Sequence, residues 1–141
     1  MSFKSVIAAT GLALGTLGIG GQVSAQENVM IVFDGSNSMW GQIEGVSKIE
    51  IARDTIGALL DGWTEDRQVG LMAYGHRRVG DCSDIETLVE PQSGATAGDI
   101  VERVQAISPR GKTPLTDAVE EAAEALSYKD TPATIVLISD G

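Results

Sequence analysis

Residues 29–38 read VMIVFDGSNS, an apolar run of five residues followed by a loop of Asp, Gly, Ser and Asn. A continuous apolar run bounded by turn residues is typical of a buried strand in a parallel sheet. Open α/β folds bind ligands at the carboxyl edge of such strands, where this loop would lie. The side chains of Asp34, Ser36 and Ser38 offer one carboxylate and two hydroxyls, a set that suits a hard cation such as Mg²⁺. The stretch therefore predicts an α/β fold with a divalent-cation site at the sheet edge.

Two further segments complete a three-part pattern. Residues 111–117, GKTPLTD, introduce a helix, and residues 133–141, ATIVLISDG, form a second apolar strand that ends in an Asp-Gly pair. Taken singly, each part consists of ordinary turn residues and predicts no more than a turn. Three such loops in this order, each at a strand end or a helix start, favour a metal site.

The three segments together resemble the von Willebrand factor type A family. Its metal-ion-dependent adhesion site has a D-x-S-x-S loop, a Thr in a G-x-T loop and an Asp in a strand-end D-G, and the resemblance covers residues from about 28 to the end. It implies that Ser36, Ser38 and Thr113 supply metal oxygens, whereas Asp34 and Asp140 act mostly through water and hydrogen bonds. The implied cation is Mg²⁺, with Mn²⁺ or Ca²⁺ as alternatives.

The rest of the chain alternates between helix and strand patterns. Ser47 and Glu50 form a capping box that predicts a helix ending before Gly62. A further helix is predicted to begin with Thr113 as N-cap and Pro114 as its first residue. Strands are predicted at residues 68–74, 85–89 and 133–139, and another helix at residues 100–107.

This alternation predicts a Rossmann-like, doubly wound and mostly parallel sheet with helices on both faces. Resemblance to the type A family implies the partial strand order 3-2-1-4, counted along the chain, with strand 85–89 as an antiparallel edge.

Residues 1–25 have the layout of a secretory signal. They carry a single charge at Lys4, an apolar Gly-rich run over residues 6–21, and the small residues VSA before the predicted cut. A transmembrane anchor is the alternative, but the run is short, is interrupted by five glycines and is followed by no basic stop signal. We expect an exported protein, periplasmic or extracellular, without a stable membrane span in its mature chain.

Length and charge limit the domain number and the partners. Removing 25 of the 141 residues leaves 116, enough for one domain with its own core, and the loss of Lys4 changes the formal net charge from −10 to −11. A chain this acidic is a poor partner for nucleic acid, whose phosphates need Lys and Arg. Type A domains continue past the strand-end Asp-Gly, so residues 26–141 are expected to be the amino-terminal part of an incomplete domain.

The loop at residues 75–82 is basic for so acidic a chain. It follows a parallel strand and should emerge at the same edge as residues 34–38, which we call the metal loop. There His76, Arg77 and Arg78 form a candidate rim that holds an acidic ligand. The alternative is a solvated loop tied down by salt links to its own acids. Cys82 is the only cysteine, which suggests half of a disulfide with a partner beyond Gly141, an intermolecular bridge or a free thiol.

Three functions are open as hypotheses. A metal held by neutral oxygens keeps much of its charge, so it would bind an Asp or Glu of a protein partner, in adhesion or complex assembly. The alternative is a metal-dependent accessory or sensor subunit of a cell-envelope complex. A metal-dependent hydrolase comes third, because haloacid-dehalogenase-like phosphatases place a second Asp where this chain has Ser36. Without that general acid, no enzyme is expected.

Overall fold

The computed structural model of the protein describes residues 27–63, 67–91 and 93–141, and the predicted signal at residues 1–25 lies outside them. The strands of its main sheet are β1 (Asn28–Asp34), β4 (Gln68–Tyr74), β5 (Ile85–Val89) and β6 (Ala133–Ile138). They lie in the order β5-β4-β1-β6, with β4 and β6 parallel to β1 and β5 antiparallel to β4. The predicted α/β class and the partial order 3-2-1-4 with an antiparallel edge are therefore confirmed.

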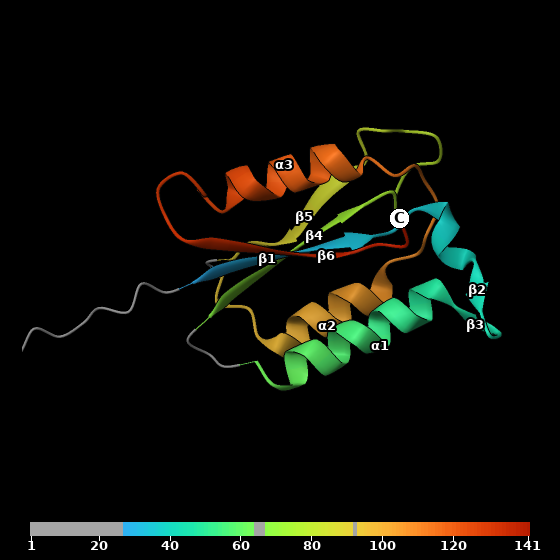
Figure 1. Cartoon of the computed structure of the whole chain (residues 1–141), viewed down its shortest axis with the longest axis horizontal. Helices are drawn as coiled ribbons and strands as arrows, with labels where there is room; N and C mark the ends of the chain where they lie inside the picture. The colour runs from blue at the N-terminus through green and yellow to red at the C-terminus, as the bar shows by residue number, and fades with distance from the viewer. Residues whose placement is uncertain (1–26, 64–66, 92) are drawn as a thin grey trace, which may run out of the picture.

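Helices cover both faces of this sheet. They are α1 (Lys48–Asp61), α2 (Ala97–Ala106) and α3 (Leu115–Ala125). Figure 1 shows α1 and α2 side by side on one face and α3 on the other. Along β1, Ile31 and Phe33 belong to the core on the α1/α2 side, whereas Met30 and Val32 belong to the core on the α3 side. Because both faces of β1 are covered, the strand reads as a continuous apolar run.

Local signals explain where the helices begin. Ser47 and Glu50 form the predicted capping box of α1, and Glu50 Oε2 accepts the backbone N–H of Ser47 at 3.2 Å. The prediction for α3 is wrong, because Thr113 is not its N-cap. Pro114 takes that position with a ψ of 56°, outside the helical range, so the helix begins at Leu115 without a side-chain cap.

A 3-10 helix and a small hairpin, neither of them predicted, lie between the metal loop and α1. They are η1 (Asn37–Trp40), β2 (Gln42–Ile43) and β3 (Val46–Ser47). The hairpin turns at Glu44 and Gly45, whose φ angles of 52° and 87° are the left-handed pair that tight hairpins need. Met39 is buried, whereas Trp40 is 51% exposed and donates its indole N–H to the backbone oxygen of Pro109 at 2.9 Å. Trp40 thereby ties η1 to the segment that precedes the G-K-T loop.

β6 ends at Ile138, one residue earlier than predicted, and among the described residues it pairs only with β1. The strand contains no charged residue, and Leu137 on it is 41% exposed. Such an edge presents backbone donors and acceptors without the charges that usually discourage pairing with another chain.

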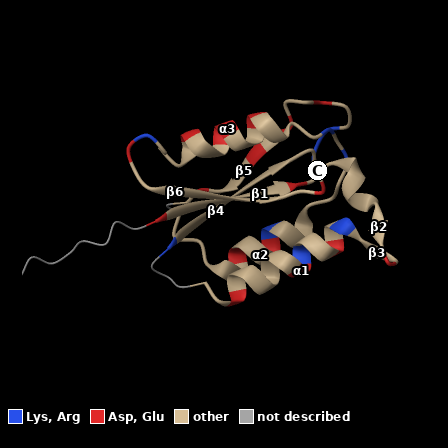
Figure 2. Cartoon of the chain, in the orientation of Figure 1, with Lys and Arg blue, Asp and Glu red and all other residues tan. Residues whose placement is uncertain are grey.

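Acidic side chains are spread over the helices and loops, as Figure 2 shows. α3 carries four of them and no Lys or Arg: Asp117, Glu120, Glu121 and Glu124. This distribution is that of a solvated surface rather than of a single binding patch. None of the helices in the described ranges is both long enough and apolar enough to cross a membrane.

Candidate metal centre

Three loops from distant parts of the chain meet at the carboxyl ends of β1 and β4. Gly35 donates its backbone N–H to the oxygen of Tyr74 at 2.8 Å, and Asn37 donates to the oxygen of Gly111 at 3.1 Å. Gly111 in turn donates its N–H to the oxygen of Gly75 at 2.7 Å. Backbone hydrogen bonds therefore join the D-x-S-x-S loop, the loop after β4 and the G-K-T loop at the predicted edge of the sheet.

Two glycines make this close approach of backbones possible. Gly75 has a φ of +67°, and a Cβ placed there would overlap the carbonyl oxygen of Lys112. A Cβ on Gly111 would lie 2.5 Å from the carbonyl oxygen of Arg78, which is also too close. A side chain at either position would push the loops apart.

The hydroxyls of the metal loop lie next to each other. Ser36 Oγ and Ser38 Oγ are 3.0 Å apart, and Ser38 Oγ donates to Asp140 Oδ1 at 2.9 Å. Ser36 is buried. The strand-end Asp-Gly pair of β6 is thus brought to the metal loop across 102 residues of sequence.

Asp34 is fully buried, and the hydrogen bonds that the structure gives it fix both of its carboxylate oxygens. Oδ1 accepts the backbone N–H of Ser36 at 2.7 Å, and Oδ2 accepts the hydroxyl of Ser139 at 2.8 Å. Ser139 Oγ accepts the hydroxyl of Tyr74 at 3.3 Å. Burial raises the pKa of Tyr74, so its phenol remains a protonated donor.

Asp140 lies between the metal loop and the start of α1. Its Oδ2 accepts a hydrogen bond from Lys48 Nζ at 2.6 Å, and its Oδ1 accepts that of Ser38. The Lys48 ammonium is the main reason that the pKa of Asp140 lies below its ordinary value. The carboxylate is therefore ionised at neutral pH.

Thr113 lies on the G-K-T loop, which the backbone contacts of Gly111 hold at the same edge. It is exposed and lies two residues after Gly111, which pairs with Ser36 in an isolated bridge. The structure therefore brings Asp34, Ser36, Ser38 and Asp140 together by hydrogen bonds, and it puts Thr113 on the adjoining loop.

The donor set fits a hard divalent cation. Hydroxyl and carboxylate oxygens are the ligands that Mg²⁺ prefers, and few carboxylates are needed because Mg²⁺ keeps several waters. No group of three or more His, Cys, Asp or Glu that could hold a metal occurs among the described residues. The candidate site therefore relies on hydroxyls together with two carboxylates.

The predicted rim residues form ion pairs or hydrogen bonds with acidic residues of the same loop and of β5, the strand that follows it. His76 Nε2 lies 2.9 Å from Glu86 Oε2, Arg77 Nε lies 2.7 Å from Asp84 Oδ1, and Arg78 Nη1 lies 3.0 Å from Asp81 Oδ2. The salt links of the alternative interpretation, a solvated loop tied to its own acids, are thus present. A role of the three residues in holding a ligand stays a prediction.

Asp84 organises this loop and was not singled out from the sequence. It is fully buried and accepts the backbone N–H groups of Arg77 and Arg78 at 2.7 and 2.8 Å in addition to the Arg77 side chain. Burial alone would raise the pKa of Asp84, but these N–H groups and the guanidinium hold it below its ordinary value. An Asp directly before a strand gives no sequence signal that separates such an anchor from a turn residue.

Cys82 lies in the same loop, where it is exposed and free among the described residues. It is the only cysteine among residues 1–141, and its role as half of a disulfide stays a prediction.

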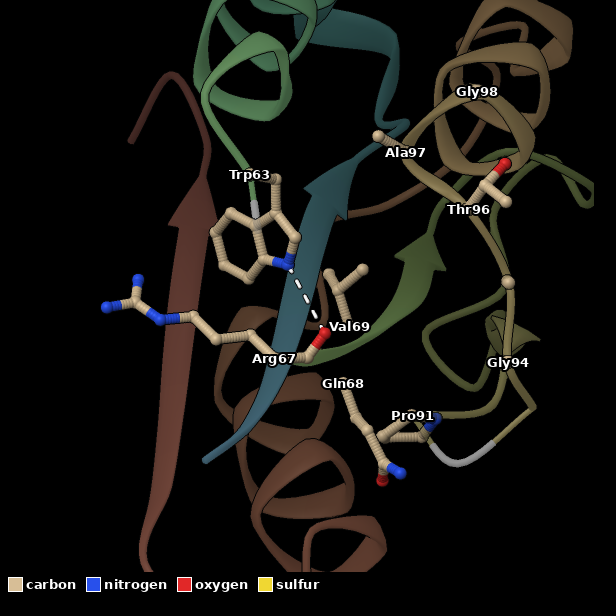
Figure 3. Close-up of a pocket in the computed structure, with 10 residues that line it drawn as sticks. Trp63, Arg67, Gln68, Val69, Pro91, Gly94, Thr96, Ala97 and Gly98 are labelled. Atoms are coloured by element: carbon tan, nitrogen blue, oxygen red, sulfur yellow. Dashed lines mark hydrogen bonds between the residues drawn. The ribbon is translucent and has the colours of Figure 1, made fainter. Parts of the chain in front are cut away.

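A cavity of about 560 Å³ lies at the opposite end of the sheet, between the start of β4 and the start of α2 (Figure 3). Trp63 lines it and donates its indole N–H to the backbone oxygen of Arg67 at 3.5 Å. Val69 and Pro91 also line it. Its lining residues lie around the starts of β4 and α2, so the cavity is separate from the candidate metal centre at the carboxyl ends of β1 and β4.

Comparison with known sequences identifies a family. The profile of the von Willebrand factor type A domain matches residues 29–141. Two proteins of Bacillus subtilis (strain 168), YwmC and YwmD, both described as uncharacterized, are each 27% identical to this chain, over 129 and 154 residues. The match to YwmC covers 85% of this chain and 56% of YwmC, and the match to YwmD covers 98% and 67%. The chain thus spans little more than half the length of YwmC.

Solved structures share the fold at lower sequence identity. The von Willebrand factor domain of the type V pili tip protein Mfa5 from Porphyromonas gingivalis superposes with a TM-score of 0.62 at 19% identity, over 84% of this chain and 39% of that one. The type A domain of SpRpn10 superposes with a TM-score of 0.59 at 21% identity, over 80% of this chain and 58% of that one. At these identities the likeness supports the fold alone.

Proposed function

Because this chain belongs to the von Willebrand factor type A domain family, we propose that its sheet-edge hydroxyls and carboxylates bind Mg²⁺ and, through it, an acidic side chain of a protein partner. Type A domains typically mediate protein interactions. The observation that carries the proposal is the hydrogen-bonded row Ser36, Ser38 and Asp140, assembled from two strand ends. Mn²⁺ and Ca²⁺ are the alternative cations.

The chemistry of the row explains why the ligand would be acidic. Ser36, Ser38 and Thr113 contribute neutral oxygens, and Asp34 is already engaged by Ser36 and Ser139. A bound cation supplies a positive charge that these neutral oxygens leave largely uncompensated. Without it, the two carboxylates of Asp34 and Asp140 outweigh the single positive charge of Lys48 and repel an acidic side chain, so partner binding should depend on the metal.

The metal assignment is tested by calorimetry with Mg²⁺ on the purified protein. We expect Asp34→Ala and Ser38→Ala to weaken binding at least tenfold, since ligands and the groups that orient them contribute about 10–100-fold each. Ser93→Ala is the matched control, because Ser93 lies in an exposed loop next to α2 and away from the metal loop. Binding by Asp34→Ala and Ser38→Ala as tight as that of the parent protein would refute the site.

The partner assignment needs a second measurement. Binding of a captured partner should disappear in EDTA and return with excess Mg²⁺, and a Glu→Gln change at the contacting residue of the partner should have the same effect as EDTA. Full affinity in EDTA would exclude a cation-bridged contact.

We further propose that the domain is a binding module rather than an enzyme and that it acts outside the cytoplasm. Ser36 stands where the phosphatase pattern has its general acid, and His76 is paired with Glu86. The layout of residues 1–25 supports export. Amino-terminal sequencing of the protein secreted by its host, with Gln26 as the expected first residue, tests export.

A further inference from the structure

Lys48 reaches the candidate metal centre from a position that the family pattern does not include. It is the first residue of α1, and its ammonium lies 2.6 Å from Asp140 Oδ2. Its backbone N–H donates to the oxygen of Gly41 at 2.8 Å, which fixes the start of its side chain. The side chain of Lys48 is 30% exposed and that of Asp140 is 9% exposed, so the pair is partly shielded from water.

Helix stability does not explain a lysine at this position. The amino terminus of a helix carries a partial positive charge, which disfavours a cation in the first turn. Ser47 and Glu50 already form a complete capping box there. The side chain of Lys48 instead turns to a carboxylate of the site, so its contribution is to the charge of that site.

The charge balance defines what Lys48 does. The two carboxylates Asp34 and Asp140 give the site two negative charges, and Lys48 cancels one of them. With a divalent cation bound, the site would have one net positive charge in the presence of Lys48 and none in its absence. We propose that Lys48 is a specificity-determining residue, which weakens cation binding and keeps the loaded site positive, so that it selects an anionic carboxylate of the partner over a neutral amide or hydroxyl.

This inference rests on the proposed function, and Mg²⁺ alone is the probe that tests it. Calorimetry compares the parent protein with Lys48→Met, which keeps the length of the side chain, and with Lys48→Arg, which keeps its charge. We expect Lys48→Met to bind Mg²⁺ about five- to tenfold more tightly, because it removes a repulsion between nearby charges, and Lys48→Arg to bind like the parent.

A melting experiment separates this role from a purely structural one. In EDTA, Lys48→Met should melt at a lower temperature than the parent, because Asp140 loses its partner. In saturating Mg²⁺ the difference should shrink or reverse, whereas a structural role predicts the same difference in both conditions.

The outcomes also separate the two proposals. Parent protein that binds Mg²⁺ while Lys48→Met binds it no more tightly would overturn the role of Lys48 and leave the metal site standing. Lys48→Arg that binds as tightly as Lys48→Met would do the same. Absence of Mg²⁺ binding by the parent would overturn the metal site and the role of Lys48 together.

Discussion

Replacing Asp84 with Ala should lower the free energy of unfolding by about 2–4 kcal/mol, because a buried donor left without a partner costs about 1–3 kcal/mol and the two backbone donors here are part-buried, which puts each in the lower part of that range. The structure gives Asp84 three donors: the backbone N–H groups of Arg77 and Arg78, and Arg77 Nε. The side chain of Arg77 is 35% exposed and can turn to water, so the two backbone groups account for most of the loss. Against a typical total of about 5–15 kcal/mol, this is a large effect.

Urea denaturation followed by tryptophan fluorescence measures this loss. Asp81→Ala is the matched control, since Asp81 lies in the same loop and also accepts several hydrogen bonds, but its side chain is 32% exposed whereas that of Asp84 is fully buried. Asp84→Asn, which keeps one acceptor oxygen, should lie between the parent protein and Asp84→Ala. If Asp84→Ala and Asp81→Ala unfold at the same urea concentration, the buried carboxylate does not anchor the loop and the reasoning is refuted.

Two further predictions concern the close approach of the backbone at Gly75 and the stability of the protein at low pH. Gly80→Ala should lower the free energy of unfolding by about 1–2 kcal/mol, because Gly80 has a positive φ. Gly75→Ala should lower it at least twice as much, because Gly75 has a positive φ and also lies against another backbone segment. Equal losses of unfolding free energy, measured in urea, would show that backbone strain alone matters. The pKa values of Asp84, Asp99 and Asp140 are lowered on folding, so these carboxylates stabilise the fold above the unfolded pKa of about 4, and that stability is lost as pH falls through their folded values. At pH values below about 4, the urea concentration at the unfolding midpoint should therefore decrease, and it should decrease less steeply with pH in Asp84→Asn. The same slope in Asp84→Asn and in the parent protein would contradict a contribution of Asp84.

Much of the fold could be predicted because its signals are local. The strand at residues 68–74 and the antiparallel strand at residues 85–89 have the predicted bounds. α2 was predicted only from Ile100, the first residue of its apolar face, although Thr96 and Asp99 form a capping box that marks its start. Residues 42–47 are too short for any periodicity, so the hairpin could be recognised only from the Glu44-Gly45 turn.

The candidate site could likewise be predicted only in part. The three-loop pattern predicted that these residues would lie at one edge, because Asp34, Ser36, Ser38 and Asp140 lie at or just after strand ends that the topology fixes and Thr113 precedes a helix at the same edge. The role of Lys48 depends on a side chain that reaches Asp140 across 92 residues of sequence, so this contact becomes visible only when the sheet brings the two segments together. The partners of Asp84 lie only six and seven residues away, but nothing in the sequence of the loop shows that its carboxylate is buried and accepts their backbone N–H groups.

The hydrogen bonds of Asp34 connect the candidate metal centre to a chromophore that belongs to the protein itself. The phenol of Tyr74 is linked to that carboxylate through a single hydroxyl, that of Ser139. The only other tyrosine, Tyr128, is 53% exposed just beyond the end of α3, and a change to Phe would remove its contribution to the spectrum. A cation that draws on Asp34 would therefore alter the polarity around a buried phenol, and the part of the near-ultraviolet difference spectrum that Tyr74→Phe removes would report occupancy of the candidate site without any added label.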